Sequence, residues 1–322
     1  MVKDLEIREF SNNVAILQLQ DLSDESRIRT YAKSLNKGSI ILLGEYVIDP
    51  FFSQEWEDLN VEFKNIESSV ADSIKDSKKI KKTRSNKQDS NMESNINSSV
   101  ENTADSKKEN LKNIESKLKN KKKIDLLLDI SKAYKHTIIA PCIEYKEQGK
   151  FKGYYKNMLL LSGGKSHTYT QQRLIQYEHW NEASFFANDI SKLPKLPLTF
   201  MANGFRFGVL FGFEAHFDEF WMEFKKAKID VVLVPTASTF SSNERWEHLL
   251  NTHSFTNSCY VFRANRIGKI VANDGYEWDF YGHSFVAFGQ DILDSLDENE
   301  GMLCVELDMN ALNELKNSWK FR

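Results

Sequence analysis

The chain has 322 residues, of which 41% are hydrophobic, and its 43 Lys and Arg against 46 Asp and Glu give a formal net charge of −3. This is enough apolar material for one large domain or two small ones, and the near-neutral charge argues against a dedicated nucleic-acid binder. No apolar run approaches the ~18–20 residues of a membrane-spanning helix, the first ten residues carry acids where a signal peptide is apolar, and three widely spaced cysteines do not suggest a disulfide framework. We therefore expect a cytoplasmic protein without a membrane partner.

Apolar strands and helices alternate along most of the chain. In order, the pattern predicts a strand over 13–18, a helix over 25–35, a strand over 39–43, a helix over 124–134, strands over 137–143, 157–161 and 207–213, a helix over 218–227, a strand over 231–234, a helix over 246–255 and a strand over 259–264. The run over 39–43 (SIILL) is typical of a strand that is buried on both faces. Helices between apolar strands indicate an α/β domain.

Residues 66–123 differ from the rest of the chain in composition. They contain 15 Lys and Arg, 9 Asp and Glu, 19 Ser and Asn, and no Gly, Pro, Cys or aromatic residue. Only 12 of these 58 residues are apolar, so the segment cannot bury enough surface to offset its chain entropy, and we predict disorder. The segment is interpreted either as a surface-loop insertion, which adds little closure entropy, or as a basic arm for an acidic partner such as RNA or a membrane surface. We expect a single domain over 1–322 that this insert interrupts.

Several motifs outside the insert follow one another in a characteristic order. They are SIILLGEYVIDPFF (39–52), SGGKSHTYTQQRLIQYEHW (162–180), GVLFGFEAHFDEFW (208–221), VVLVPTAST (231–239) and RWEHLLNTHSFTNSCYVFRANRIGK (245–269). This order resembles the nitrilase, or carbon–nitrogen hydrolase, superfamily. The resemblance implies a four-layer α-β-β-α sandwich and a homodimer that pairs through the side of the helix after the elbow motif over 208–221. The chain has no HExxH, paired-cysteine or phosphate-binding glycine motif, so we expect no metal and no cofactor.

The resemblance also implies a Glu-Lys-Cys site. In that superfamily a cysteine thiolate attacks an amide or nitrile carbon, a glutamate acts as base, and a lysine with a backbone N–H holds the oxyanion; a thiol needs such a base to become nucleophilic. The glutamate position falls on Glu45, and a second glutamate that many members keep near the lysine falls on Glu144. Tyr169 and Leu174 set a register in which the lysine position falls on Gln171, which can donate a hydrogen bond but carries no charge.

The nucleophile position falls on Gly212. Glycine cannot form a thioester, although it offers the permissive backbone of a sharp elbow. Phe213, Glu214 and His216 follow in the elbow as candidate binding residues, with a surface histidine as the alternative for His216. The three cysteines, which fall in predicted strands, are interpreted as small buried residues and not as replacement nucleophiles: Cys142, Cys259 and Cys304.

These substitutions leave open whether the protein is an enzyme. The preferred interpretation is a catalytically degenerate member of the family that keeps a pocket for an amide-like or carboxylate-like molecule, or that acts as an interaction subunit. The alternative is an amide or nitrile hydrolase in which Glu45 activates water directly, without a thiol, on a substrate held by Gln171, Glu144 and the elbow amides. A further hypothesis places the function in partner binding by the insert over 66–123.

Overall fold

The fold is that of a computed structural model, which describes residues 5–7, 12–49, 120–148, 151–191, 195–271 and 276–322. Residues 1–51 and 123–322 form one compact unit, to which the sheets below belong. Of the predicted insert, residues 66–119 lie outside the described part of the chain. Residues 120–123 instead belong to a helix that continues to 134, so the insert is shorter at this end than its composition indicates.

The first sheet has six strands in the order β17-β2-β3-β4-β5-β6. The strands are β2 (Asn13–Gln18), β3 (Ile40–Leu43), β4 (Thr137–Gln148), β5 (Phe151–Ser162), β6 (Lys165–Thr170) and β17 (Gly301–Glu306). The strands β2, β3 and β4 run parallel, and parallel neighbours need crossover connections. The described helices of these connections are α1 (Glu25–Ser34) and the helix over 120–134.

The second sheet has seven strands in the order β1-β9-β10-β11-β12-β15-β16. The strands are β1 (Leu5–Ile7), β9 (Leu198–Ala202), β10 (Phe205–Val209), β11 (Val231–Thr236), β12 (Tyr260–Asn265), β15 (Phe285–Phe288) and β16 (Asp291–Ser295). The central strands β10, β11 and β12 are parallel, and their crossovers contain α5 (Asp218–Lys226) and α6 (Asn243–Asn257). The sequence predicted both of these helices.

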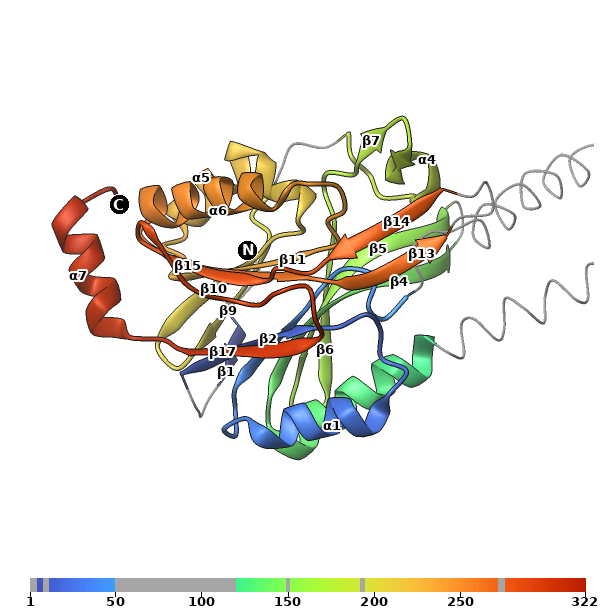
Figure 1. The fold of residues 1–322 in the computed structure, drawn as a ribbon, viewed down its shortest axis with the longest axis horizontal. Helices are drawn as coiled ribbons and strands as arrows, with labels where there is room; N and C mark the ends of the chain where they lie inside the picture. Colours follow the sequence, from blue (N-terminus) through green and yellow to red (C-terminus); the bar gives the residue numbers. More distant parts are fainter. Residues whose placement is uncertain (1–4, 8–11, 50–119, 149–150, 192–194, 272–275) are drawn as a thin grey trace, which may run out of the picture. The chain divides into compact units, whose positions relative to one another are not determined.

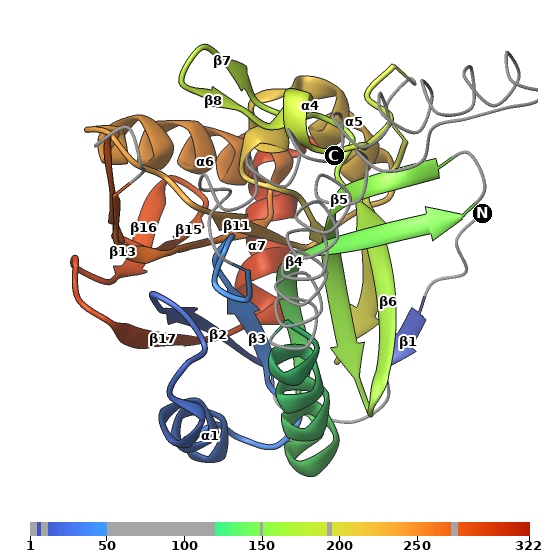
Figure 2. The ribbon, with the colours of Figure 1, turned by 90° about the vertical axis from the view of Figure 1, so that its right-hand side faces the viewer.

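Three clusters of buried apolar side chains divide the unit into four layers. The central cluster joins the two sheets, a second packs α1 and the 120–134 helix on the six-stranded sheet, and a third packs α5 and α6 on the seven-stranded sheet. The alternation along β5 shows the division, because Met158 and Leu160 lie in the central cluster whereas Leu159 and Leu161 face the helices. The predicted α-β-β-α sandwich is confirmed, with α5 and α6 on one side and α1 on the other (Figure 1; Figure 2 shows the unit from its side).

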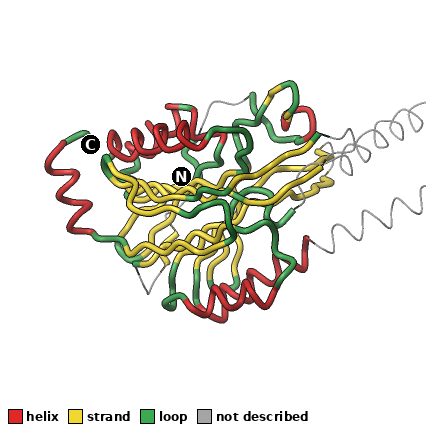
Figure 3. The backbone as a smooth tube through the Cα atoms, viewed as in Figure 1, coloured by secondary structure: helices red, strands yellow, loops and turns green. Residues whose placement is uncertain are grey.

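Smaller elements extend beyond the two sheets (Figure 3). They are the hairpin of β7 (Gln176–Tyr177) and β8 (Trp180–Asn181), the short helix α4 (Glu182–Phe185), the hairpin of β13 (Ile267–Val271) and β14 (Glu277–Tyr281), and the C-terminal helix α7 (Met309–Trp319). The helix α7 begins after Asp308, whose carboxylate accepts hydrogen bonds from the first free N–H groups of the helix. In the described ranges no helix is long and apolar enough to cross a membrane. Pairing of two copies stays a prediction.

The predicted strand over 207–213 is too long, because β10 ends at Val209. The N–H of Leu210 still donates to the carbonyl of Leu233 in β11, at 3.0 Å. The next two N–H groups donate to side chains instead. The N–H of Phe211 donates to Glu214 Oε2 at 3.1 Å, and that of Gly212 donates to Oε1 of Glu45, which follows β3 of the other sheet, at 3.0 Å. The ladder therefore stops where carboxylates replace strand carbonyls as acceptors, and a 3₁₀ turn over Phe213–His216 follows.

Asp49, in the segment after β3, makes the stability of the fold depend on pH. Its side chain is buried, and its Oδ2 accepts a hydrogen bond from the N–H of Ile143 at 2.6 Å. Burial raises the pKa of Asp49 to about 7, against the opposing effects of this hydrogen bond and of Lys123. Because the pKa in the folded state lies above its ordinary value, this contribution to stability is complete below about pH 4 and is lost as the pH rises through about 7.

We expect Asp49→Asn to flatten this dependence, because asparagine keeps an acceptor for Ile143 but does not ionise. Between pH 5 and 7, the free energy of unfolding of the wild type should fall relative to that of the variant by about 1.4 kcal/mol per pH unit. Urea unfolding at pH 5, 6 and 7 measures the difference. Parallel pH profiles for the two proteins would contradict the assignment to Asp49.

Candidate functional site

Glu45 lies directly beyond β3, at a point where the two sheets meet. Its backbone N–H donates to the carbonyl of Thr236, the last residue of β11 in the other sheet, at 3.1 Å. Gly44 permits this approach, because a Cβ at that position would lie 2.8 Å from the backbone nitrogen of Arg266. Backbone contacts between the sheets therefore fix the position of the Glu45 carboxylate, which is buried.

An ammonium group lies between Glu45 and a second carboxylate. The Nζ of Lys156, on β5, contacts Glu45 Oε2 and lies 2.5 Å from Glu182 Oε1, at the start of α4. The exposed fractions of the three side chains are 3% for Lys156, 6% for Glu45 and 0% for Glu182. A buried ion pair is stable only where further hydrogen bonds satisfy its remaining atoms.

Glu182 receives those further hydrogen bonds. Its Oε1 accepts from the hydroxyl of Tyr46 at 2.6 Å and its Oε2 from the N–H of Ile175 at 3.2 Å. The guanidinium of Arg266 donates to the carbonyl of Tyr46 at 2.9 Å and thereby holds this residue, which has a left-handed backbone, in place. The cluster of Glu45, Lys156 and Glu182 is thus anchored to both sheets.

Burial is the main influence on ionisation in this cluster. It raises the pKa of Glu45; the Lys156 ammonium and the Gly212 N–H oppose this effect, and the Glu182 carboxylate adds to it. Burial lowers the pKa of Lys156, but the two carboxylates outweigh it, and the pKa of this ammonium is raised. Lys156 therefore stays charged, while the pKa of Glu45 is shifted upward, the direction that strengthens a carboxylate as a general base.

Gly212 faces the free oxygen of Glu45. Its N–H donates to Glu45 Oε1 at 3.0 Å, and its backbone has φ −53° and ψ −45°, the right-handed helical conformation. Any residue adopts this conformation, so the expectation that the elbow needs the backbone freedom of glycine is wrong. Glycine fits this position because there is no room for a side chain. A Cβ at Gly212 would lie 2.7 Å from Cγ2 of Thr236 and 3.1 Å from the carbonyl oxygen of Pro235.

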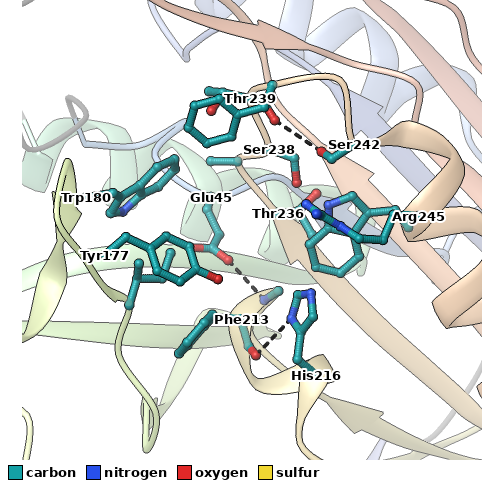
Figure 4. A pocket seen from close by; sticks show the side chains of 15 residues that line it. Glu45, Tyr177, Trp180, Phe213, His216, Thr236, Ser238, Thr239, Ser242 and Arg245 are labelled. Atoms are coloured by element: carbon teal, nitrogen blue, oxygen red, sulfur yellow. Dashed lines mark hydrogen bonds between the residues drawn. The ribbon is translucent and has the colours of Figure 1, made fainter.

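A pocket opens over Glu45 and Gly212, with an empty volume of about 550 Å³ that includes its open mouth. Figure 4 shows Glu45 in the middle, with Tyr177 and Trp180 on one side and Ser242 and Arg245 on the other. The lining combines aromatic side chains with hydroxyl and charged groups, and polar groups in such a site fix the orientation of a small molecule. The lining residues are Glu45, Ile175, Tyr177, Trp180, Gly212, Phe213, His216, Thr236, Ala237, Ser238, Thr239, Phe240, Ser242, Arg245 and Trp246.

Two of the predicted site residues lie outside this cluster. The Nε2 of Gln171 donates to the carbonyl of Arg173 at 2.6 Å, and its backbone N–H donates to the carbonyl of Lys156 at 3.1 Å, so it neighbours the lysine without replacing it. The carboxylate of Glu144 is half exposed, and it pairs with Lys146 at 3.3 Å and accepts from Asn157 at 2.8 Å. The buried second glutamate is Glu182.

The elbow residues have different environments. Phe213 and His216 line the pocket, and desolvation lowers the pKa of His216. Glu214 does not line it: this buried carboxylate accepts from the Tyr169 hydroxyl at 2.9 Å and from the N–H of Gln172 at 2.6 Å, and so ties the elbow to the segment after β6. Burial raises the pKa of Glu214 to about 7. In the described ranges no group of three His, Cys, Asp or Glu residues is placed to hold a metal ion.

The motifs did not reveal Lys156 or Glu182. A signal for Lys156 exists in the alternation of β5, because residues 156, 158 and 160 share one face, and Met158 and Leu160 on that face belong to the core between the sheets. A lysine in register with core residues needs a buried acid as partner. Glu182 carries no comparable signal, since it follows two irregular two-residue strands.

The sequence was compared with protein families and with curated proteins. The family model described as carbon-nitrogen hydrolase matches residues 109–317, which is 209 of the 322 residues of the chain. No curated protein matches the sequence.

Solved structures match the fold at low sequence identity. A carbon-nitrogen hydrolase from Helicobacter pylori G27 has a TM-score of 0.65 at 14% identity, over 96% of this chain and 93% of that chain. Nit3 of Saccharomyces cerevisiae, a member of branch 10 of the nitrilase superfamily, has a TM-score of 0.63 at 14% identity, over 95% and 93%. An amidase from Nesterenkonia sp. has a TM-score of 0.61 at 16% identity, over 97% and 98%. The family match and the shared fold agree, and the chain belongs to the carbon–nitrogen hydrolase family.

Proposed function

We propose that this protein binds a small amide-like or carboxylate-like molecule over Glu45 and does not form a covalent thioester with it. The contact between Gly212 and Thr236 carries this proposal. The Thr236 methyl group occupies the space that the first side-chain carbon of a nucleophile at position 212 would need, since the two would lie 2.7 Å apart. This packing supports a site without a covalent nucleophile at position 212.

The position of Lys156 supports the same conclusion. Its ammonium is held by two carboxylates and does not line the pocket. Preorganised donors accelerate acyl transfer only where they face the developing oxyanion, and each is worth ~10²–10³ in rate. Lys156 instead holds Glu45 in place, and a ligand meets the carboxylate without meeting the ammonium.

The three cysteines of the chain do not replace the missing nucleophile. None of them lines the pocket. Cys142 and Cys259 are buried, which raises the pKa of Cys142 well above its ordinary value and that of Cys259 to about 12. Cys304 is exposed, so its predicted burial is wrong, although partial desolvation still raises the pKa of its thiol. A thiol in its neutral form is a poor nucleophile.

One observation favours a second candidate function. The raised pKa of Glu45 and its place in the lining are what a general base needs to activate a water molecule in the pocket. In this alternative the protein hydrolyses an amide or nitrile without a covalent intermediate. Such help by a base is worth only ~10²–10⁴ in rate, so turnover would be slow.

A panel of amides, nitriles and N-carbamoyl compounds separates the two functions. We expect the wild type to release no ammonia from any of them and to bind at least one saturably, with a change in the fluorescence of Trp180 and Trp246 in the lining. Glu45→Gln should weaken this binding by at least about tenfold, because a hydrogen bond to a charged group is lost. Glu144→Gln, the same change at a half-exposed site, is the matched control and should leave the affinity unchanged.

Two results would contradict the proposal. Ammonia release that disappears in Glu45→Gln and survives iodoacetamide would establish the thiol-independent hydrolase. Binding of no compound in the panel, or binding that Glu45→Gln leaves unchanged, would show that the pocket over Glu45 is not the functional site.

A further inference from the structure

The side of the pocket that contains Ser242 and Arg245 has groups that nothing in the site chemistry above uses (Figure 4). Arg245 is exposed at this side, and no described side chain forms an ion pair or hydrogen bond with its guanidinium. Glu244, the acid in the first turn of α6, is exposed and does not line the pocket. A guanidinium without a partner among the described residues, at the mouth of a pocket, is suited to a carboxylate or phosphate group of a ligand.

A helix N-terminus with an unused cap lies at the same place. The helix α6 has 15 residues and begins after Ser242, whose side chain makes no capping hydrogen bond. The hydroxyl of Ser242 instead donates to the carbonyl of Thr239 at 3.1 Å and meets the hydroxyl of Tyr281 at 2.9 Å. The first N–H groups of α6 have no cap from this side chain, and a helix N-terminus of this length favours an anion.

Thr239 supplies an independent observation. This residue lines the pocket and is only 4% exposed, yet its Oγ1 has no hydrogen-bond partner among the described residues. An unpaired buried hydroxyl costs free energy, and such groups are rare in folded proteins. A ligand oxygen in the pocket would satisfy it.

A buried positive charge lies behind this side of the pocket. Arg263, on β12, is fully buried, and in the described part of the chain no carboxylate forms an ion pair with it. Its guanidinium stands 5.0 Å from the ring of Trp246, which lines the pocket, and donates to the Tyr281 hydroxyl at 3.0 Å. Tyr281 in turn contacts Ser242. A short chain of hydrogen bonds therefore links a buried cation to the pocket lining.

We infer that Thr239, Arg245 and the N-terminus of α6 form an anion subsite of the pocket, and that the ligand is an organic acid whose acidic group binds there. The inference rests on the proposed binding function and adds the chemical class of the ligand. Glu45 accepts hydrogen bonds, so the other end of the ligand carries a donor such as an amide NH₂. Aromatic side chains of the lining, among them Trp180 and Phe213, suit a flat or apolar body.

The test compares two ligands that differ only in the acidic group, benzamide and 4-carbamoylbenzoate, by isothermal titration calorimetry on the full chain. We expect 4-carbamoylbenzoate to bind the wild type at least about tenfold more tightly. Arg245→Ala should reduce the ratio of the two affinities to near one, and Thr239→Val, which keeps the shape of the side chain, should reduce it about threefold to tenfold. Lys226→Ala, which removes an exposed positive charge on α5, is the control and should leave the ratio unchanged.

The outcomes distinguish the anion subsite from the proposed binding function. Equal binding of the two compounds, or a ratio that survives both Arg245→Ala and Thr239→Val, overturns the anion subsite and leaves the proposed binding function intact. Binding of neither compound overturns both. Competition by millimolar inorganic phosphate against 4-carbamoylbenzoate, but not against benzamide, supports a subsite that accepts oxyanions in general, whereas a lack of competition assigns it to carboxylates.

Discussion

Replacing Gly212 with cysteine is expected to destabilise the protein, and removing the Thr236 methyl group at the same time is expected to restore most of the loss. A Cβ at position 212 would lie 2.7 Å from Thr236 Cγ2, which is fully buried and cannot move away freely. Overpacking of this kind costs ~1–3 kcal/mol. Thr236→Ser deletes the methyl group and keeps the hydroxyl that donates to Asn265 at 2.9 Å.

The double variant Gly212→Cys/Thr236→Ser is also expected to carry a reactive thiol. The introduced Cβ would lie 3.2 Å from Glu45 Oε1, so the thiol would have a carboxylate base beside it. We expect iodoacetamide to modify it at least about tenfold faster than Cys142 or Cys259, because burial raises the pKa of both of those thiols. Mass spectrometry of the alkylated peptides measures the rates.

Stability measurements complete this experiment. Urea unfolding of the wild type, Gly212→Cys, Thr236→Ser and the double variant gives the coupling between the two positions. A coupling above ~1 kcal/mol in favour of the double variant is expected. A single variant Gly212→Cys that is as stable as the wild type would show that Thr236 does not occupy the space of a nucleophile, and the main support for non-covalent binding would be lost.

The fold was largely predictable because its central strands are apolar. The strand β3 lies between parallel neighbours and is buried along its whole length, so its sequence IILL has one interpretation. The edge strands β6 and β16 have the sequences KSHTYT and DILDS, and none of their residues is fully buried. Backbone hydrogen bonds rather than burial hold such strands in the sheet. Because backbone hydrogen bonds do not depend on the side chains, the sequence of an edge strand need not alternate between apolar and polar residues.

The site was less predictable because its groups come together only in the folded chain. The motifs located Glu45 and Gly212, which are 3.0 Å apart across the two sheets. They assigned the loss of a lysine from position 171, but an ammonium reaches Glu45 from Lys156 on the neighbouring strand β5. A side chain several carbons long can reach one position from either of two strands, and the linear order of motifs does not distinguish them. The close contact of Thr236 with position 212 is likewise a property of packing.

Replacing Lys156 with methionine is expected to be strongly destabilising. Methionine keeps much of the apolar volume of the side chain but leaves Glu45 and Glu182, whose oxygens contact the same nitrogen, facing each other without a cation. Removing one partner of a buried ion pair typically costs ~3–5 kcal/mol. The control is Lys146→Met, the same change in the half-exposed pair with Glu144, where the loss should stay below ~1 kcal/mol.

The pH dependence and a second variant identify the cause of this loss. In Lys156→Met the ammonium that lowers the pKa of Glu45 is gone, so this pKa rises further. The variant should therefore regain stability on acidification from pH 8 to pH 5, as the Glu45 carboxylate takes up a proton. Lys156→Met/Glu45→Gln removes one of the two charges, while Glu182 keeps its hydrogen bonds from Tyr46 and Ile175. We expect this double variant to recover most of the stability at pH 8.

The comparison distinguishes electrostatics from packing. If the loss came from a cavity or from strain around the methionine, it would be the same at pH 5 and pH 8, and Glu45→Gln would add to it. If it comes from two facing carboxylates, acid and Glu45→Gln should each relieve it, and their effects should not add, because one proton and one amide remove the same repulsion. Urea unfolding of Lys156→Met and the double variant at both pH values therefore tests whether Lys156 serves to hold the Glu45 carboxylate ionised at the floor of the pocket.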